Sequence, residues 1–170
     1  MNRRYFLESC ARFGVVAAVS QSLLGSVIAQ NKGRTRADAA TKRIMKSDDE
    51  WKRILSREQY DITRQAGTEA PYSSPLLNIH KRGTFGCVCC DLALFSSKTK
   101  FDSRTGWPSF WAPIAKQNVL ERIDKSLTET RTEVLCARCD AHLGHVFDDG
   151  PKPTGLRYCI NGVALKFSPT

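Results

Sequence analysis

Two matched cysteine pairs constrain this chain more than any other feature of its sequence. Cys87 and Cys90 form one C-x-x-C motif, and Cys136 and Cys139 form a second. A C-x-x-C turn lets two thiolates bind one ion about 2.3 Å from each sulfur, and two such turns complete a tetrahedral zinc site. Four thiolates leave no open position on the ion. We therefore predict one structural zinc ion per chain, which joins two distant turns of the fold.

Three other arrangements fit the same residues. A Cys2His2 site would use the three-residue repeat Cys136, Cys139, His142 and His145, but it would leave the first cysteine pair without partners. The six cysteines that follow the N-terminal segment could instead form three disulfides. Each C-x-x-C could also be redox-active, although neither is surrounded by the strand–helix pattern typical of such motifs. Cys89, inside the first motif, is interpreted as a small buried apolar residue.

The first 29 residues have the organisation of an export signal. Arg3 and Arg4 precede an aromatic residue and a leucine, an uncharged stretch runs from position 13 to 29, and small or aliphatic residues end it. The arginine pair resembles a twin-arginine signal, which exports proteins already folded. We predict export to the bacterial periplasm with removal of residues 1–29. A retained signal that anchors the protein in the membrane is the alternative.

The remaining sequence is predicted to contain a flexible linker at 30–46 and one domain at 47–170. The formal net charge is +9, but basic residues often stand next to acidic ones, as at 121–125. This pattern is typical of a solvated surface and argues against a nucleic-acid partner. No second apolar stretch is long enough to span a membrane. We expect a monomer without stable membrane insertion once the signal is removed.

Local patterns predict a mainly β domain with a small N-terminal helical lobe. Ser47 with Glu50, and Ser56 with Gln59, have the spacing of capping boxes that begin two short helices. Short apolar or alternating runs separated by turn residues then predict strands at 84–87, 93–96, 109–114, 119–124, 128–136, 145–147, 156–161 and 163–167. The expected core is mainly antiparallel, with zinc between two loop tips.

Cys159 stands apart from the two cysteine pairs, on one of these predicted strands. Alternate residues of a strand share a face, so Arg157 and Asn161 are expected beside Cys159. The positive charge of Arg157 would favour the thiolate and lower the pKa of Cys159, as a nucleophile requires. Asn161 would add a neutral hydrogen-bonding group near the atom that Cys159 attacks.

Two further groups are candidates for the same site. His142 and His145 would face opposite ways on a regular strand, but Gly144 permits a bend that turns both toward one pocket. Histidine transfers protons readily near neutral pH. Trp107 lies in an aromatic-rich turn that Pro108 stiffens, and beside a thiolate its indole could bind a substrate methyl group.

Longer motifs carry a family resemblance. They are Phe-Asp-Ser at 101–103, Gly-Trp-Pro-Ser-Phe at 106–110, Arg-Thr-Glu-Val at 131–134, His-Leu-Gly-His-Val-Phe at 142–147, Asp-Gly-Pro at 149–151 and Thr-Gly-Leu-Arg-Tyr-Cys-Ile-Asn at 154–161. Together they resemble the peptide-methionine (R)-S-oxide reductases, the B-type methionine sulfoxide reductases, from about residue 47 to 167. The resemblance implies two antiparallel sheets with helices at one end, a tent-like β fold stapled by zinc.

The resemblance also implies roles for individual residues. Cys159 would attack the sulfur of methionine-R-sulfoxide and become a sulfenic acid. His145, assisted by His142, would protonate the departing oxygen, while Asn161 and Arg157 organise the polar side of the site. The substrate would contact Trp107 and Phe147, and zinc would be bound by Cys87, Cys90, Cys136 and Cys139.

The chain departs from a common family pattern at two places. Thr105 stands where many members have a resolving cysteine, and Gly162 stands where a serine commonly follows Cys-Ile-Asn. Without a cysteine at 105, the usual internal disulfide with Cys159 cannot form. We therefore predict reduction by an external thiol, either a thioredoxin-like protein or a small molecule, and treat Cys89 as the less favoured resolver. The alternative functions are a zinc-stabilised binding module and a thiol–disulfide oxidoreductase.

Overall fold

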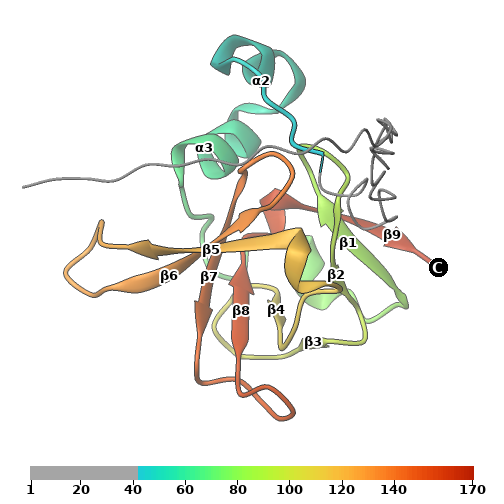
Figure 1. Cartoon of the computed structure of the whole chain (residues 1–170). Helices are drawn as coiled ribbons and strands as arrows, with labels where there is room; N and C mark the ends of the chain where they lie inside the picture. Colours follow the sequence, from blue (N-terminus) through green and yellow to red (C-terminus); the bar gives the residue numbers. More distant parts are fainter. Residues whose placement is uncertain (1–41) are drawn as a thin grey trace, which may run out of the picture. The chain divides into compact units, whose positions relative to one another are not determined.

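Two antiparallel sheets and two short helices make up the part of the chain that this computed structural model describes, residues 42–170 (Figure 1). The predicted mainly β fold with an N-terminal helical lobe is confirmed. The predicted export signal at 1–29 and most of the predicted linker lie outside the described residues. Within residues 42–170, no helix has both the length and the apolar character needed to cross a membrane.

The two helices begin where the capping boxes predict. Helix α2 spans Asp48–Ile54, and helix α3 spans Arg57–Gln65. At the first cap, the Ser47 hydroxyl accepts a hydrogen bond from the Glu50 backbone N–H, and the Glu50 carboxylate accepts one from the Ser47 backbone N–H. The second cap repeats this exchange between Ser56 and Gln59. Helix α3 ends at Ala66, which has a left-handed backbone.

The segment before α2 is tied to the second cysteine motif. Residues 42–46 have no regular secondary structure. Ile44 packs against the core, and its backbone N–H donates to the carbonyl of Arg138 at 2.7 Å. Arg43 also forms an ion pair with Asp140. Residues 43 and 44, at the end of the predicted flexible linker, thus contact the folded domain.

The smaller sheet has three strands in the order β2-β1-β9, where β1 is Gly83–Cys87, β2 is Ala93–Ser96 and β9 is Leu165–Pro169. The larger sheet has six strands in the order β3-β4-β8-β7-β6-β5. Its strands are β3 (Lys100–Phe101), β4 (Ser109–Phe110), β5 (Val119–Asp124), β6 (Arg131–Cys136), β7 (His142–Phe147) and β8 (Arg157–Ile160). Short 3-10 helices lie at Pro75–Asn78, Lys116–Asn118 and Gly162–Ala164.

Several predicted strand boundaries are wrong, and β3 was not predicted. The strand expected at 109–114 stops after two residues, because the chain then turns toward Pro113, which has no N–H to donate. The strand expected at 128–136 begins at Arg131, and the one expected at 163–167 begins at Leu165 after a 3-10 turn. Conversely, β7 begins at His142 and not at His145.

The core lies between the two sheets. Phe95 on β2 stacks on Phe110 on β4 with ring centroids 4.5 Å apart, and Phe85 on β1 meets the same ring edge-on at 5.0 Å. All three rings are fully buried. These aromatic contacts join the smaller sheet to the larger one, and burial of such rings is a main source of folding free energy.

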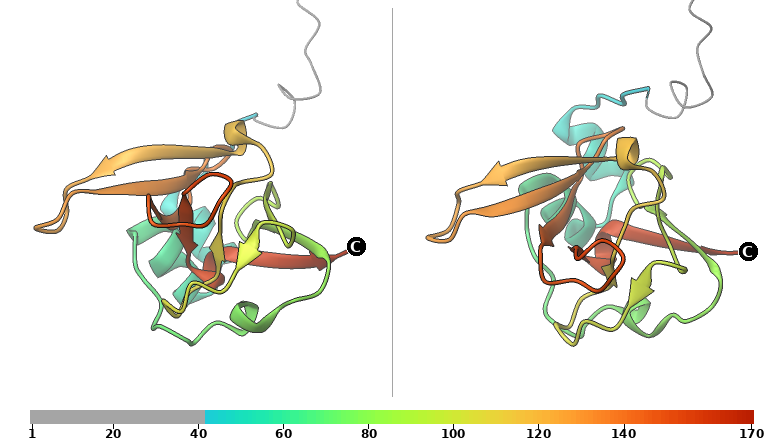
Figure 2. Two further views of the ribbon diagram at one scale, coloured as in Figure 1. Left: turned by 90° about the horizontal axis from the view of Figure 1, so that it is seen from below. Right: turned by 60° about the horizontal axis from the view of Figure 1, so that its bottom comes forward.

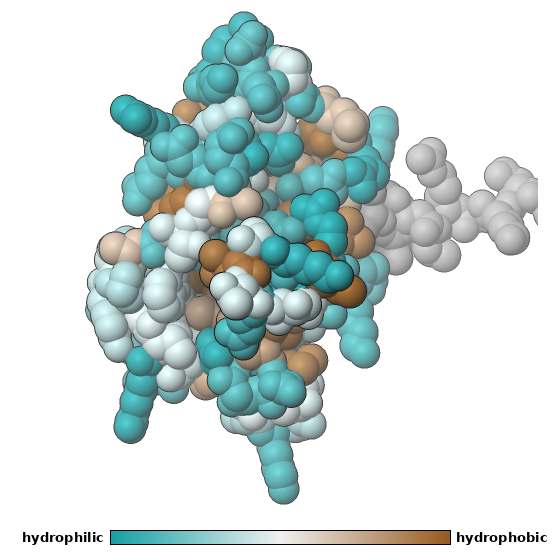
Figure 3. All heavy atoms as spheres, turned by 90° about the vertical axis from the view of Figure 1, so that its left-hand side faces the viewer, coloured by the Kyte–Doolittle hydropathy of each residue, from teal (hydrophilic) through white to brown (hydrophobic). Residues whose placement is uncertain are grey.

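Strands β5 and β6 form a hairpin that projects from the body of the domain (Figures 1 and 2). Ile123 and Leu127 are exposed on it, at 68% and 60% of their surface. Figure 3 views the molecule from the side toward which the hairpin points in Figure 1, and hydrophilic side chains dominate that face, with smaller apolar areas between them. The strand ends next to the hairpin loop carry Asp124 and Arg131, which reach the site described next.

Candidate active site

The two C-x-x-C motifs fold into matching turns. In each, the carbonyl of the first cysteine accepts the backbone N–H four residues later at 2.9 Å, from Asp91 in the first turn and from Asp140 in the second. Asp91 and Asp140 also share a left-handed backbone, with φ of 56° and 55°. Equivalent turns bring both thiols of each motif to the same side.

The four sulfurs gather into one group that can hold a metal ion. The Sγ atoms of Cys87 and Cys139 are 3.7 Å apart, those of Cys90 and Cys136 are 3.5 Å apart, and all four lie within 4.8 Å of one another. A tetrahedral ion with bonds of about 2.3 Å requires sulfurs about 3.8 Å apart, so the four thiols fit such an ion. One turn joins β1 to β2 and the other joins β6 to β7, so the cluster links the two sheets.

This grouping favours the four-thiol site over the Cys2His2 and three-disulfide arrangements. None of the six cysteines in the described residues forms a disulfide. His142 and His145 do not join the cluster, because their rings are bonded to carboxylates elsewhere. Cys89 lies beside the cluster, half-buried, with its thiol 3.4 Å from the hydroxyl of Thr63 on α3.

Cys159 lies in a separate cavity on the larger sheet. It stands at the centre of β8, directly opposite His145 of β7 on one side and Ser109 of β4 on the other. The cavity has a volume of about 130 Å³ and is lined by Trp107, Arg131, His145, Phe147, Cys159 and Asn161, among others. The structure therefore brings five of the seven predicted catalytic and substrate-binding residues to one cavity. His142 and Arg157 lie behind its wall.

A bulge in β7 explains why both histidines turn the same way. Val134 of β6 pairs with Gly144 of β7, and the next residue, Leu135, pairs with His142. Leu143 therefore has no partner on β6 and is an extra residue in β7. One extra residue reverses the alternation of a strand, and histidines three apart therefore share a face. Their ring centroids are 5.5 Å apart. Of the two, His145 lines the cavity and His142 does not, so the rings are neighbours but do not both face one pocket as expected from the sequence.

Gly144 also permits the close approach of β7 to β8. Its φ is 153°, and a Cβ atom there would lie 2.1 Å from the carbonyl oxygen of Cys159. Any side chain at position 144 would push the two strands apart. His145 would then lose its place opposite Cys159.

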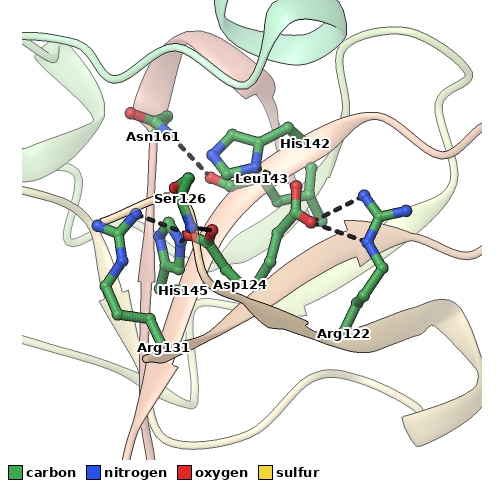
Figure 4. Close-up of polar contacts among 9 residues, drawn as sticks. Arg122, Asp124, Ser126, Arg131, His142, Leu143, His145 and Asn161 are labelled. Atoms are coloured by element: carbon green, nitrogen blue, oxygen red, sulfur yellow. Dashed lines mark hydrogen bonds and ion pairs between the residues drawn. The ribbon is translucent and has the colours of Figure 1, made fainter. Parts of the chain in front are cut away.

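Each histidine is held by a carboxylate that an arginine also binds (Figure 4). His145 Nε2 lies 2.8 Å from Asp124 Oδ2, which also accepts from Arg131 at 2.7 Å. His142 Nδ1 lies 2.7 Å from the carboxylate of Glu133, which also accepts a hydrogen bond from Arg122 at 2.8 Å. Asp124 and Arg131 are register partners across the hairpin, and so are Arg122 and Glu133.

The two histidines have different surroundings. His142 is only 4% exposed, and burial lowers its pKa even though Glu133 opposes that shift. Burial alone would raise the pKa of Glu133, but hydrogen bonds from His142 and Arg122 hold it below its usual value. A neutral His142 that donates from Nδ1 to an ionised Glu133 satisfies both shifts, and it leaves Nε2 without a proton or a partner. His145, which lines the cavity, is thus the better placed proton donor.

The expected lowering of the pKa of Cys159 is wrong for the free protein. Burial raises this pKa and is the largest effect. Thr105, Arg157 and Ser109 each act in the opposite direction, but together they do not outweigh burial. The Thr105 hydroxyl is 3.8 Å from the sulfur, and it is linked through Ser103 to Ser109.

Arg157 acts on the cavity from behind its wall. Its guanidinium binds both carboxylate oxygens of Asp149 at 2.8 Å and lies 4.3 Å from the ring centroid of Phe147. These contacts fix Phe147, which lines the cavity. They also provide partners for the buried guanidinium of Arg157.

Four charged residues near the site were not predicted as site residues: Glu69, Asp124, Arg131 and Glu133. The Arg-Thr-Glu-Val motif at 131–134 contains two of them and was a signal for their importance. Glu69 and Asp124 reach the site only through long-range contacts. Local sequence patterns do not report such contacts.

Comparisons with known proteins agree with this geometry. The SelR domain family matches residues 55–169. The chain belongs to the peptide methionine sulfoxide reductase B family. It is 53% identical to "Peptide methionine sulfoxide reductase MsrB" of Hahella chejuensis over 74% of the chain and 90% of the relative. It is 56% identical to "Peptide methionine sulfoxide reductase B1, chloroplastic" of Oryza sativa subsp. japonica over 73% of the chain and 58% of the relative.

A further relative in this MsrB family is "Peptide methionine sulfoxide reductase MsrB" of Pseudomonas putida strain W619. It is 55% identical, and the match covers 75% of the chain and 96% of the relative. The family match includes the Cys159 cavity and both cysteine turns, so the two sites belong to the same domain.

The raised pKa of Cys159 makes its alkylation depend on pH in a defined way. Because the thiolate is the reactive form, the rate of alkylation by iodoacetamide should rise with a midpoint above the value of about 8.5 for an ordinary cysteine. Thr105→Val should move the midpoint higher, since it removes a hydroxyl that favours the thiolate. Peptide-level mass spectrometry measures the rate at Cys159. Thr128→Val, at an exposed position, is the control, and a midpoint below the ordinary value would contradict the prediction.

Proposed function

We propose that this chain reduces methionine-R-sulfoxide in proteins and peptides to methionine, with Cys159 as the nucleophile. Membership of the MsrB family supports the activity. The observation that supports the role of Cys159 is its position in a cavity that also presents the imidazole of His145 and the indole of Trp107. These are a nucleophile, a proton donor and an apolar wall, the three elements that reduction of a methyl sulfoxide requires.

The reaction then proceeds in two stages. The Cys159 thiolate forms a bond to the sulfoxide sulfur while His145 gives a proton to the sulfoxide oxygen. The protonated oxygen then moves to Cys159 as the bonds from the substrate sulfur to this oxygen and to Cys159 break. Methionine leaves with two electrons more than the sulfoxide, and Cys159 is oxidised to a sulfenic acid. Two external thiols then reduce the sulfenic acid, releasing water and a disulfide and restoring the Cys159 thiol.

Cavity residues orient the substrate in this reaction. Trp107 contacts the methyl group, and Phe147, held by Arg157, borders the same space. The Nδ2 group of Asn161 donates one hydrogen bond to the Leu143 carbonyl, and its second N–H is available for the sulfoxide oxygen (Figure 4). His142 supports His145 from behind the wall, with its ring edge toward the neighbouring ring.

We propose that the reductant is external because, within residues 42–170, no cysteine lies beside Cys159. Thr105 occupies the adjacent position, at 3.8 Å from the sulfur. Cys89 lies at the metal cluster and is bonded to α3, on a different part of the fold. A thioredoxin-like protein or a small-molecule thiol fits this arrangement.

The metal in the cysteine cluster is proposed to be zinc. Four thiolates in tetrahedral reach, without an oxygen or nitrogen ligand, favour zinc over the hard cations. Zinc would contribute folding free energy there, since it joins the two sheets at a distance from the chemistry.

The cellular setting is proposed from the sequence alone. Residues 1–29 would direct export through the twin-arginine route to the periplasm, and the mature domain would act there as a monomer on oxidised proteins. A signal that stays uncleaved and anchors the protein is the second candidate. The interspersed charges do not favour a nucleic-acid partner.

The activity itself is tested with the two sulfoxide epimers. The purified protein with dithiothreitol should reduce a methionine-R-sulfoxide peptide and not the S epimer. Cys159→Ser should abolish turnover, because serine cannot form the sulfenic acid, whereas Cys89→Ser should retain it. Liquid chromatography of the peptide gives both rates. Full activity of Cys159→Ser would refute the proposal, because turnover would then not depend on the Cys159 thiol.

The identity of the oxidised intermediate separates external from internal reduction. After one equivalent of substrate without reductant, Cys159 should be found as a sulfenic acid that dimedone traps. Thr105→Cys should instead give a disulfide between positions 105 and 159, because the side chains at these positions are already in contact. Mass spectrometry distinguishes the two products. A Cys89–Cys159 disulfide in the unaltered protein would overturn external reduction.

Removal of one cluster cysteine should release the metal. Cys90→Ser is expected to lower the bound zinc from one ion per chain to nearly none and to reduce the melting temperature, since three thiolates bind more weakly and the link between the sheets is lost. Cys89→Ser, one residue away, should keep one ion. Elemental analysis and thermal unfolding measure these effects. Equal zinc content in both variants would show that the cluster does not bind the ion.

A further inference from the structure

Glu69 is a buried acidic residue that the proposed mechanism does not use. It lies in the irregular segment between α3 and the 3-10 helix Pro75–Asn78, and only 5% of its surface is exposed. Burial raises the pKa of its carboxyl group, against two backbone hydrogen bonds that favour the ionised form. A buried carboxylate is costly unless its oxygens are fully bonded.

All four hydrogen-bonding atoms of Glu69 bind residues of the Cys159 site or its immediate continuation. Oε1 accepts from the Gly162 backbone N–H at 2.6 Å, and Oε2 accepts from the Val163 backbone N–H at 2.9 Å. The backbone N–H of Glu69 donates to Asn161 Oδ1 at 3.1 Å, and its carbonyl accepts from Trp107 Nε1 at 3.2 Å.

These contacts fix the two walls of the cavity relative to each other. Trp107 and Asn161 both line the cavity beside Cys159, yet they come from different segments of the chain. The Trp107 indole and the Asn161 amide are both hydrogen-bonded to the backbone of the same residue, Glu69. Asn161 is held from the other side by the Leu143 carbonyl at 3.1 Å, so its amide has a single orientation.

The carboxylate also fixes the turn that follows the nucleophile. Gly162 and Val163 begin the 3-10 turn Gly162–Ala164, and Gly162 lies two residues after Ile160, the last residue of β8. Their two N–H groups would be buried without partners if the carboxylate were removed. A Cβ atom at Gly162 would lie 1.8 Å from the Ser74 hydroxyl, so the lack of a side chain lets the segment of Glu69 pack against this turn.

We propose that Glu69 is a positioning residue for methionine sulfoxide reduction, one that sets the methyl-binding indole of Trp107 and the amide of Asn161 at fixed places around Cys159. This inference rests on the proposed function for its catalytic consequence. Its structural part, the attachment of Trp107 to Glu69, is independent of that function.

The test uses the full chain and the variants Glu69→Gln and Glu69→Ala. A misplacement of about 1 Å near reacting atoms costs on the order of 100-fold in rate, so kcat/KM for the R-sulfoxide peptide should fall about 10-fold in Glu69→Gln and about 100-fold in Glu69→Ala. KM should rise because a displaced Trp107 binds the methyl group less well. The value of kcat should fall because a displaced Asn161 no longer meets the sulfoxide oxygen. Glutamine should rescue part of the loss because it is isosteric and keeps one acceptor.

A spectroscopic readout separates positioning from a loss of stability. The indole N–H resonance of Trp107, assigned with Trp107→Phe, should exchange with solvent faster in both Glu69 variants, because its acceptor moves. Thr63→Ala is the matched control, since Thr63 is also buried and, within the part of the chain that the structure describes, its hydroxyl bonds to Gln59 and Cys89 and not to the cavity. At a temperature where all variants are folded, this control should keep the unaltered exchange rate and kinetic constants.

The outcomes distinguish the inference from the proposed function. Unchanged indole exchange together with unchanged KM and kcat in folded Glu69→Ala would overturn the inference and leave the reductase activity standing. An unaltered protein that does not reduce the R-sulfoxide would refute the proposed function, while the resonance would still report whether Glu69 holds Trp107. Slower turnover in Thr63→Ala of the same size as in Glu69→Ala would also overturn the inference, since stability alone would then explain the loss.

Discussion

The close antiparallel pairing of β7 with β8 is the constraint on which the site depends. Gly144 allows the strands to approach where any Cβ atom would meet the Cys159 carbonyl, and this places His145 directly opposite Cys159. The bulge at Leu143 then turns His142 to the same face. The His145 imidazole and the Cys159 sulfur are therefore brought together by backbone geometry and not by a flexible loop.

Sequence reasoning located the elements whose signals are local. The capping boxes at Ser47 and Ser56 fixed the helix starts, because a capping box is completed within four residues. Each C-x-x-C turn is likewise a local signal, whereas the meeting of the two turns, with Cys87 and Cys139 52 residues apart, was predicted from the four ligands that a tetrahedral ion requires. Strand β3 was missed because two residues do not make a detectable alternation.

The remaining features depend on residues far apart in the chain. Asp124 and His145 are 21 residues apart, and Glu69 and Asn161 are 92 apart. Their contacts exist only once the strands pair and the segment after α3 folds back. The charge state of Cys159 was mispredicted for a related reason, since the sign depends on how deeply the sulfur is buried, and the strand pattern reports only which neighbours it has.

The burial that raises the pKa of Cys159 has a consequence for how the sulfur reacts with oxidants. Peroxides attack thiolates far faster than they attack thiols, and irreversible overoxidation begins from the thiolate. A resting sulfur that stays protonated is a poor target for stray peroxide. The catalyst is thereby spared the damage that it repairs in other proteins.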